Sequence, residues 1–342
     1  MRQTVDRCMP RVASRPMRVV VTGGAGFIGS NLVDALLSDG HHVVVVDNFS
    51  TGVVDNLHRA TQTRRCQIVE GDLLDTTLVA DAVRGADAVF HLAANADVRF
   101  GWNHPWRDLE QNVAATINVL EAARASDVRR VLFSSTGSVY GEAQVIPTLE
   151  DAAFPQQTSL YGASKLAAEG YLGAYAEAGH LSVTVFRFVS VLGPRYSHGH
   201  VIDFVRQLAR DPARLHILGD GTQRKSYLDV DDCVAAMRLC LPRDPRFEVF
   251  NLGVDSYCTT TESATWICER MGAKPEVRFG GGDRGWIGDN PFIFLDTTRI
   301  RSLGWAHRRS IREAVERTVD DLLAHPARLD APAEDRAAAS EI

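Results

Sequence analysis

The sequence predicts an α/β fold with a doubly wound parallel sheet, followed by a smaller C-terminal domain. Three observations predict it. Short apolar runs alternate with segments of helical periodicity over the first 190 residues. The run from Met17 to Val21 leads through the glycine-rich turn TGGAGFIGS (22–30) into a helical segment. Beyond residue 190 the elements become shorter and richer in glycine and charge. This order is typical of a parallel sheet covered by helices on both faces, with a second domain after it.

The turn carries glycines three residues apart, at Gly23, Gly26 and Gly29. A backbone without Cβ atoms can turn tightly, approach a pyrophosphate and pack the helix close to the strand. The helix N-terminus then offers free N–H groups and a partial positive charge. The next apolar run, 42–46, ends at Asp47, about 20 residues beyond the glycines, where a carboxylate can bind ribose hydroxyls. Together these features predict a Rossmann-type dinucleotide-binding unit.

Later apolar runs predict strands at 66–70, 88–92, 131–135 and 183–188, and helical spacing predicts helices at 76–83, 105–125 and from 159 onward. In the helix 105–125, the spacing of Leu109, Val113, Ile117 and Leu120 predicts one buried face. Asn112 points inward by the same spacing.

Several polar residues near element ends have more than one interpretation. Asp72 follows the third strand, where it can lie near an adenine or cap the helix from Thr76. We interpret His91 as a hydrogen-bonded core histidine rather than a catalyst. Asp231 and Asp232 are interpreted as the N-cap and a first-turn carboxylate of a helix at 234–241.

The chain of 342 residues is long enough for about two domains. We expect a flexible extension at 1–16, a Rossmann domain at 17–190 with a returning segment at about 228–255, a substrate-binding domain at 191–227 and 256–325, and a flexible tail at 326–342. The smaller elements are predicted at 202–209, 215–218, 225–228, 248–252, 261–271 and 310–323, and 248–252 is expected to return to the main sheet.

Composition excludes several classes of partner. A formal net charge of -6 argues against nucleic acid and anionic membranes, because both attract basic surfaces. No apolar segment reaches the roughly 18 residues of a membrane span, and residues 1–16 lack the apolar stretch of a signal peptide. The six cysteines form no CxxC pair, and we interpret them as reduced core residues. The sequence thus favours a cytoplasmic protein.

Tyr161 and Lys165 lie four residues apart on one predicted helix, so their side chains share a face. A tyrosine with a pKa near 10 is a poor base, but a neighbouring ammonium stabilises the phenolate and lowers that pKa. Ser135 and Thr136 end the strand that comes before this helix and can hold a substrate oxygen against the tyrosine. An isolated pair of this kind would be an ordinary surface pair, but beside a dinucleotide unit it indicates acid/base chemistry.

Eight segments in this order carry a family resemblance: TGGAGFIGS, DNFSTG (47–52), GDLLD (71–75), HLAA (91–94), SSTGSVYG (134–141), YGASK (161–165), RFVSVLGPR (187–195) and GDGTQRKSYLDVDD (219–232). The chain resembles the extended short-chain dehydrogenase/reductase family, and within it the NAD-dependent nucleotide-sugar epimerases of the UDP-glucose 4-epimerase type. The resemblance covers about residues 17–325 and is far more specific for the family than for the substrate.

The resemblance implies that Tyr161 is the acid/base, Lys165 its partner and a ribose ligand, and Thr136 the hydroxyl that positions the sugar. It implies an NAD site formed by Gly23, Gly26, Phe27, Ile28, Asp47, Asn48, Ser50, Thr51, Gly52, Asp72, Leu73, Leu92, Ala93, Ala94, Asn112, Ser134, Tyr161, Lys165 and Phe188. Substrate contacts are expected from Arg99, Ser135, Thr136, Ser190, Arg224, Lys225, Asp283 and Arg284. It also implies a homodimer, in which helices at about 106–125 and 159–178 of two subunits form a four-helix interface.

Departures from the family pattern concern the substrate. Ser190 stands where many members carry an asparagine, and Lys225, next to Arg224, stands where they carry an arginine. Gly280 replaces the arginine before their PGD segment, while Asp283 is kept and Arg284 follows it. The diphosphate contacts are therefore expected to fall to Arg224, Lys225 and Arg284. The pair His198 and His200 is interpreted as a pocket loop rather than a metal site.

These features predict C4 epimerisation of a nucleotide-linked hexose or heptose through a transient 4-keto sugar. A nucleotide-sugar dehydratase or net oxidoreductase of the same family is the nearest alternative. Dehydratases of the family carry an Asp-Glu pair after the active-site threonine, where this chain has Gly137 and Ser138. An alternative of another class is a catalytically silent NAD-binding regulator, which the retained Thr136, Tyr161 and Lys165 disfavour.

Asp47 predicts a preference for NAD over NADP, because its carboxylate would lie where the 2′-phosphate of NADP must bind and Asn48 offers no compensating charge. We expect Asp47→Ser to reduce the ratio of the affinity for NAD to the affinity for NADP. Calorimetry on cofactor-stripped protein measures both affinities, and comparable values for the unaltered chain would contradict this prediction.

Overall fold

Seven parallel strands form the main sheet, in the order β11-β6-β5-β4-β1-β2-β3. In this computed structural model, which describes residues 15–96, 98, 100–152, 156–282, 284–285, 290 and 292–329, they are β1 Arg18–Thr22, β2 His42–Asp47, β3 Cys66–Glu70, β4 Ala88–His91, β5 Arg130–Thr136, β6 Ser182–Phe188 and β11 Phe247–Leu252. The predicted Rossmann-type sheet is confirmed, and the return of 248–252 to its edge beside β6 is confirmed as well. Strand order reverses between β1 and β4, the place where such sheets bind ligands.

Successive residues of each central strand enter two different cores. Val19 and Val21 of β1 pack with one hydrophobic cluster, while Val20 between them packs with the other. The cause is the alternation of side chains across a strand, which makes a strand buried on both faces a continuous apolar run. Because valine dominates β1 and β2, both faces of the sheet are lined by stiff β-branched side chains.

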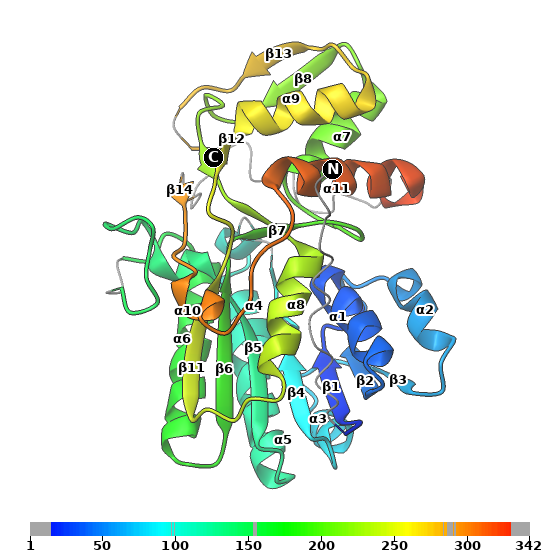
Figure 1. Cartoon of the computed structure of the whole chain (residues 1–342), viewed down its shortest axis with the longest axis vertical. Coiled ribbons are helices and arrows are strands. Elements are labelled where there is room, and N and C mark those ends of the chain that lie inside the picture. The colour runs from blue at the N-terminus through cyan, green and yellow to red at the C-terminus, as the bar shows by residue number, and fades with distance from the viewer. Residues whose placement is uncertain are drawn as a thin grey trace, which may run out of the picture.

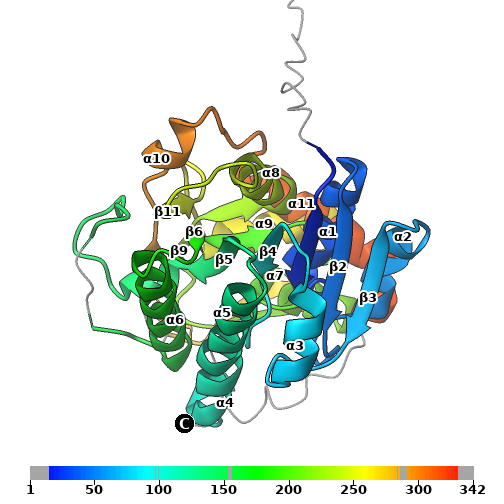
Figure 2. The same ribbon diagram turned by 90° about the horizontal axis from the view of Figure 1, so that it is seen from below.

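Helices cover both faces of the sheet (Figures 1 and 2). One face packs against α1 (Phe27–Ser38) and α8 (Val230–Cys240), and the other against α3 (Thr76–Val83), α5 (Ala115–Ala125) and α6 (Leu160–Glu177). Short turns η1 (Val54–Leu57) and α2 (His58–Thr61) lie between β2 and β3. The helices on the two faces leave the carboxyl ends of the strands to be covered by the rest of the chain.

The predicted helix at 105–125 is interrupted by a π-helical segment. It consists of α4 (Pro105–Asp108), the π-helical η3 (Leu109–Ala114) and α5. The extra residue in a π turn rotates the later side chains about the axis, so the predicted buried face is wrong in part. Leu109 is exposed and Ile117 half-buried, whereas Thr116 and Val119 are buried. Asn112 does point inward and is 1% exposed.

A smaller lobe lies over the carboxyl ends of the strands (Figure 1). Its helices are α7 (His200–Arg210), α9 (Thr260–Met271) and α11 (Ile311–Ala324), whereas the short α10 (Thr298–Arg301) lies beside β11 of the main sheet. Its strands form three small sheets, from β7 (Ser190–Leu192) with β10 (Tyr227–Asp229), β8 (Arg214–Ile217) with β13 (Glu276–Phe279), and β9 (Arg224–Lys225) with β12 (Cys258–Thr259) and β14 (Phe292–Ile293). The smaller elements predicted at 202–209, 215–218, 261–271 and 310–323 correspond to α7, β8, α9 and α11. The single strand predicted at 225–228 is wrong, because those residues are divided between β9 and β10 of two different sheets.

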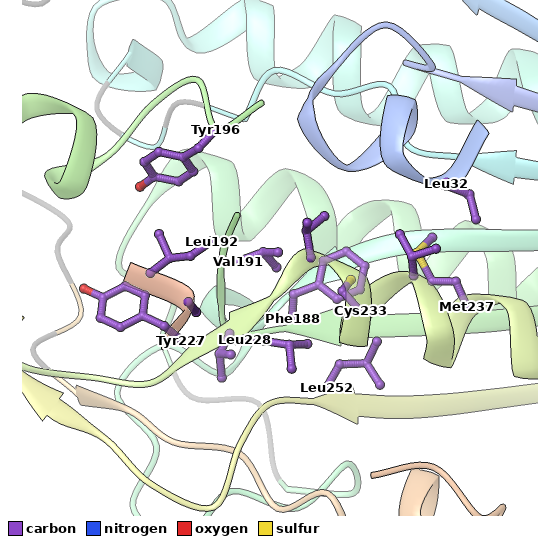
Figure 3. Packing of buried hydrophobic residues seen from close by; sticks show 14 of the residues in the cluster. Leu32, Phe188, Val191, Leu192, Tyr196, Tyr227, Leu228, Cys233, Met237 and Leu252 are labelled. Atoms are coloured by element: carbon purple, nitrogen blue, oxygen red, sulfur yellow. The ribbon is translucent and has the colours of Figure 1, made fainter. Parts of the chain in front are cut away.

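The lobe and the main sheet share one buried cluster (Figure 3). Leu32 on α1 and Met237 on α8 belong to it, together with Phe188, Leu192 and Tyr227 toward the lobe. The chain therefore crosses between the two parts through packed apolar side chains, and the division at residue 190 stays a prediction.

Two predicted helix caps fall on other residues. Asp75, and not Asp72, caps α3, because its carboxylate accepts hydrogen bonds from the Thr77 and Leu78 N–H groups. Asp229, and not Asp231, caps α8, which begins four residues earlier than the sequence predicted; Asp231 and Asp232 lie in its first turn. Each of these segments contains several aspartates, so the sequence indicates that a helix is capped there but does not indicate which aspartate caps it.

The prediction of a flexible tail from residue 326 is wrong for residues 326–329, and residues 330–342 lie outside the described residues. Residues Pro326–Arg328 form a short 3-10 turn (η5), and Arg206 donates hydrogen bonds to the Arg328 and Leu329 carbonyl oxygens. Cys233, Cys240 and Cys258 are buried free thiols, Cys66 and Cys268 are half-buried ones, and Cys8 lies outside the described residues. Among the described helices, none has the length and apolar character that crossing a membrane requires.

Candidate active site

The glycine turn lies at the carboxyl end of β1, where the strand order reverses. Gly23 has a φ of +67°, and a Cβ there would lie 2.7 Å from the Ala93 backbone nitrogen. A Cβ at Gly29 would overlap the Gly23 carbonyl oxygen. Both positions therefore require glycine, and the first turn of α1 packs directly on the strand ends.

The start of α1 fits the pyrophosphate of a dinucleotide. Its N-cap is Gly26, which has no side chain to satisfy the first helical N–H groups. These groups and the helix dipole favour an anion. Phe27 and Ile28, both half-buried, are the first residues of the helix.

Asp47 ends β2 beside this turn. One carboxylate oxygen accepts the Ala25 N–H at 2.8 Å and the other the Phe49 N–H at 2.9 Å, so the side chain shapes the turn itself. A Cβ at Gly52 would lie 2.8 Å from the same carboxylate. The backbone at position 52 can therefore come this close to Asp47 only because the residue is glycine. Each carboxylate oxygen retains a further lone pair for a ribose hydroxyl.

The structure brings together a second group of predicted cofactor residues. Asn48 donates a hydrogen bond to Asp72 at 2.8 Å and accepts one from the Ser50 hydroxyl at 2.7 Å. Thr51 is exposed next to them. The side chain of Leu73, in contrast, is buried in the core against α3 and α5. The Asn118 amide donates a hydrogen bond to the Leu73 carbonyl oxygen at 2.9 Å.

Leu92, Ala93 and Ala94 are half-buried in the loop that leaves β4. Ser134 donates a weak hydrogen bond to the His91 carbonyl oxygen at 3.3 Å, and Phe188 packs in the cluster between sheet and lobe (Figure 3). His91 itself is fully buried between Thr22 and Thr116, at 2.7 and 2.9 Å. The interpretation of His91 as a hydrogen-bonded core residue is confirmed.

Asn112 is not open to solvent but joins three segments. Its side-chain oxygen accepts the Asn95 N–H at 2.8 Å, and its amide donates to the Asn95 carbonyl oxygen and to Ser164 on α6. It lies in the π turn, which changes the direction of side chains along the helix. Asn112 thus fixes the loop after β4 to the helix that carries Tyr161 and Lys165.

Tyr161 and Thr136 are brought together by α6 and the end of β5. A hydrogen bond to Thr136 favours the Tyr161 phenolate, but burial outweighs it and, with nearby Asp108, raises the pKa of Tyr161 to about 12. The expectation that the phenol is already acidified by Lys165 is wrong for the protein alone, because desolvation of the ring dominates.

Lys165 is 2% exposed, so the alternative of an ordinary surface pair is excluded. Its ammonium nitrogen lies 4.4 Å from the centre of the Phe133 ring and has no hydrogen-bond partner among the described residues. Burial lowers the pKa of Lys165 to about 7, while the carboxylate of Glu169 opposes the shift. Such an unsatisfied buried donor fits a hydroxyl-bearing ligand such as ribose.

Sequence reasoning missed the partner of Ser135. Its hydroxyl donates a short hydrogen bond to Glu169 on α6 rather than pointing to the same side as Thr136. Glu169 also accepts from Arg187 on β6, with side chains 5% and 4% exposed. Arg187 further donates to the Tyr140 hydroxyl at 2.6 Å and to the Glu150 carbonyl oxygen. An arginine inside the apolar run 182–188, and an acid four residues after Lys165, are signals that could have found this pair.

The predicted substrate cations point in different directions. Phe292 pairs with Arg224 and Ile293 with Lys225 across β14 and β9, so Lys225 shares a face with Ile293. Ile293 is the side chain nearest to Gly137, whereas Arg224 lies 4.0 Å over the Phe292 ring on the other face. Lys225 donates to the Asn290 carbonyl oxygen at 2.6 Å.

Arg284 pairs with Glu142, in the segment that follows Thr136 and η4 (Gly137–Tyr140). Ser190 is exposed at the start of β7. His200 bonds to Ser263 at 2.8 Å and stacks on Tyr227, which makes it part of the packing of the lobe. Arg99 and Asp283 lie outside the described residues.

The chain matches the model of the NAD dependent epimerase/dehydratase family over residues 19–253. It is 36% identical over 310 residues to a UDP-glucose 4-epimerase of Mycolicibacterium smegmatis, a match that covers 89% of this chain and 98% of the relative. The crystal structure of a UDP-galactose 4-epimerase superposes with a TM-score of 0.81 at 39% identity, covering 90% of this chain and 99% of the other.

Other relatives are named for another reaction or for another sugar. UDP-glucuronic acid decarboxylase 1 of Arabidopsis thaliana is 30% identical, over 91% of this chain and 71% of the relative. The UDP-glucuronic acid 4-epimerase of Bacillus cereus, solved with UDP-glucuronic acid and NAD, is 27% identical with a TM-score of 0.82, over 90% of this chain and 99% of the other. Similarity alone therefore leaves the reaction and the sugar open within one family.

Replacing Lys165 by the uncharged methionine should stabilise the fold at low pH. Because the pKa falls from 10.5 to about 7 on folding, the unfolded chain binds the extra proton between these values, and stability rises with pH across that window. Below pH 7 the full cost of burial applies. We expect Lys165→Met to be more stable at pH 6, by an amount on the order of 5 kcal/mol if the whole shift is expressed, and the difference to shrink toward pH 10. Urea unfolding at several pH values measures it.

The exposed Lys274→Met provides the matched control and should change stability little at any pH. A constant loss of stability for Lys165→Met across the whole range would contradict the prediction.

Proposed function

Because the chain belongs to the NAD-dependent epimerase/dehydratase family and uses NAD as its cofactor, we propose that it epimerises a nucleotide-linked hexose or heptose at C4. The observation that carries the proposal is the placing of Tyr161 beside Thr136, with buried Lys165 on the same helix face as the tyrosine.

Tyr161 is the proposed acid and base. It would take the proton of the C4 hydroxyl as hydride leaves that carbon, which oxidises the sugar to the 4-keto form. When the keto sugar has turned, C4 takes hydride back and Tyr161 returns the proton to the oxygen, so the product is not oxidised overall. Thr136 hydrogen-bonds the same oxygen and aligns it with the tyrosine. Bound NAD supplies the nicotinamide ring that accepts and returns hydride and, when oxidised, a positive charge that favours the phenolate.

Lys165 is the proposed electrostatic partner. Its pKa near 7 means that a modest change in local charge sets whether it is an ammonium. A phenolate at Tyr161, four residues away, favours the ammonium, and the ammonium in turn favours the phenolate. The remaining donors of Lys165 are free for the ribose of NAD, as the family resemblance implies.

The structure disfavours the dehydratase alternative. A Cβ at position 137 would lie 2.8 Å from Ile293 and 3.2 Å from the Phe188 carbonyl oxygen. The acidic side chain that dehydratases of the family carry after the threonine would therefore fit only if Ile293 moved. The Ser138 hydroxyl accepts a hydrogen bond from the Thr136 hydroxyl at 3.2 Å, and a hydroxyl cannot serve as the acid or base that a dehydratase needs. A net oxidoreductase shares the Tyr161 chemistry and differs in releasing its cofactor. Absence of turnover with every nucleotide sugar would revive the silent-regulator alternative.

For the sugar nucleotide we propose Lys225, Ser190 and Arg284 as polar contacts, together with Arg99 and Asp283 on the family resemblance. Ser135 is left out, because Glu169 holds its hydroxyl in the interior. Arg224 is left out as well, because its guanidinium stacks on Phe292 away from Gly137. The remaining cofactor assignments made from the sequence stay proposals. For Leu73 we propose a backbone contact with NAD, and for Asn112 an indirect role, because its side chain binds the neighbouring segments at Asn95 and Ser164.

We also propose a homodimer through α6 and the helical segment from α4 to α5, and a cytoplasmic location. Small residues Ala167, Gly170 and Ala174 form an exposed stripe on α6, which allows close approach of a second helix. Trp106 is 71% exposed and Leu109 45%, an unusual exposure for large apolar side chains. Light scattering on the purified protein tests the dimer, and a monomer at micromolar concentration would contradict it.

Tyr161→Phe should remove most turnover and leave sugar-nucleotide binding nearly intact, since the ring stays and only the proton acceptor is lost. We expect a rate lower by about 10²-fold or more. Tyr175→Phe, farther along α6, removes only a hydrogen bond to Glu121 and is the matched control. Near-normal turnover of Tyr161→Phe would exclude Tyr161 as the base.

Turnover in D₂O distinguishes the epimerase from the dehydratase. A C4 epimerase returns the same hydride to the same carbon and exchanges protons only at oxygen. We therefore expect a product of unchanged mass after its hydroxyl groups have back-exchanged, measured by mass spectrometry. Carbon-bound deuterium, or a product lighter by one water, would show that the keto sugar enolises and that the epimerase proposal is wrong.

A further inference from the structure

A short segment of the lobe crosses the first helix of the sheet. Residues 193–196, here called the strap, connect β7 to the loop before α7. The Asn31 amide donates to the Pro194 carbonyl oxygen at 3.2 Å, and Arg195 donates to the Asp34 carboxylate at 2.6 Å. The Tyr196 ring packs edge-on against the Phe27 ring, with centroids 5.6 Å apart. Three consecutive strap residues thus hold α1.

The three residues that receive the strap lie on one face of α1. Phe27, Asn31 and Asp34 are spaced four and three apart, the spacing of neighbours along a helix surface. All three are half-buried. Phe27 is also the first residue of the helix, directly after the glycine turn, so the strap reaches the end where the pyrophosphate is proposed to bind.

The strap adopts a backbone conformation that is uncommon for its sequence. Arg195 has a φ of +71°, in the left-handed region that residues with a Cβ seldom occupy. The turn is closed by the Tyr196 N–H donating to the Gly193 carbonyl oxygen at 3.3 Å, and Asp321 on α11 accepts the Arg195 N–H at 2.8 Å. Surrounding contacts therefore impose a conformation that the chain alone would not prefer, a situation common at ligand clamps.

The ion pair between Arg195 and Asp34 is sheltered, with side chains 13% and 21% exposed. At this depth a charge-assisted hydrogen bond is less screened by salt than one at the surface. Tyr196 is 7% exposed and shares the cluster of Leu192 and Tyr227 (Figure 3). The strap is consequently anchored at both ends, by the lobe core and by α1.

We propose that the strap retains bound NAD by fixing the N-terminal end of α1 to the lobe, with Arg195 as its positioning residue. An enzyme that returns hydride to its own intermediate must keep the reduced cofactor until the sugar has turned, because loss of NADH would strand the keto sugar. The strap ties the cofactor helix to the same lobe that is proposed to bind the sugar. This inference goes beyond the proposed function and requires only NAD binding.

The test follows release of NADH from the reduced, cofactor-loaded protein after mixing with excess NAD, by fluorescence and without any sugar. Asp34→Asn removes the carboxylate charge, and Arg195→Gly removes the guanidinium while accepting the positive φ. We expect either variant to release NADH about tenfold faster or more, the effect of losing one charge-assisted hydrogen bond. Arg195→Lys, which keeps the charge, should restore part of the retention.

Asp39→Asn is the matched control. Asp39 is the C-cap of the same helix and pairs with Arg238, at the end of α1 that points away from the glycine turn. It should leave the release rate unchanged. A double variant Asp34→Asn/Arg195→Gly that releases NADH no faster than the faster single variant would support the pair acting as a unit. Unchanged release in both single variants, or equal acceleration by Asp39→Asn, would overturn the proposal.

Discussion

The arrangement of the reactive residues depends on the buried ion pair between Glu169 and Arg187. Two charges removed from water are tolerated only when paired and fully hydrogen-bonded. Here Ser135 satisfies the carboxylate, and Tyr140 and the Glu150 carbonyl oxygen satisfy the guanidinium. These partners come from β5, η4 and the segment that follows it, while the pair itself joins α6 to β6. Sliding or rotating α6 would unpair both charges, so the helix has one position, and that position brings Tyr161 to Thr136.

The same network sets the charge of the site. Glu169 lies one helical turn beyond Lys165, and its carboxylate opposes the loss of the lysine proton that burial causes. Glu169 also neutralises Arg187, while the buried Asp108 carboxylate near Tyr161 adds to desolvation in raising the pKa of the phenol. The phenolate therefore depends on the cations supplied to the site, Lys165 and the oxidised nicotinamide, and not on the tyrosine alone.

Features that depend on local pattern could be predicted from the sequence, and features that depend on spatial neighbours could not. The valine runs, the glycine spacing and Asp47 locate the strands and the turn, because each reflects a backbone requirement within a few residues. The π turn at Leu109–Ala114 is invisible to periodicity, which assumes a constant twist, so Leu109 was placed on the wrong face. The opposite directions of Arg224 and Lys225 depend on a two-residue strand, β9, that becomes visible only through its partners. Ser135 was misassigned because its partner, Glu169, lies on another element.

The close approach of Ile293 to Gly137 also has an evolutionary consequence. A side chain at position 137 would press on Ile293, which a segment far away in the sequence contributes. A larger residue at 137 alone displaces Ile293, and a smaller residue at 293 alone leaves a void. A change at one of the two positions is therefore favoured only together with a change at the other, although more than 150 residues of chain lie between them.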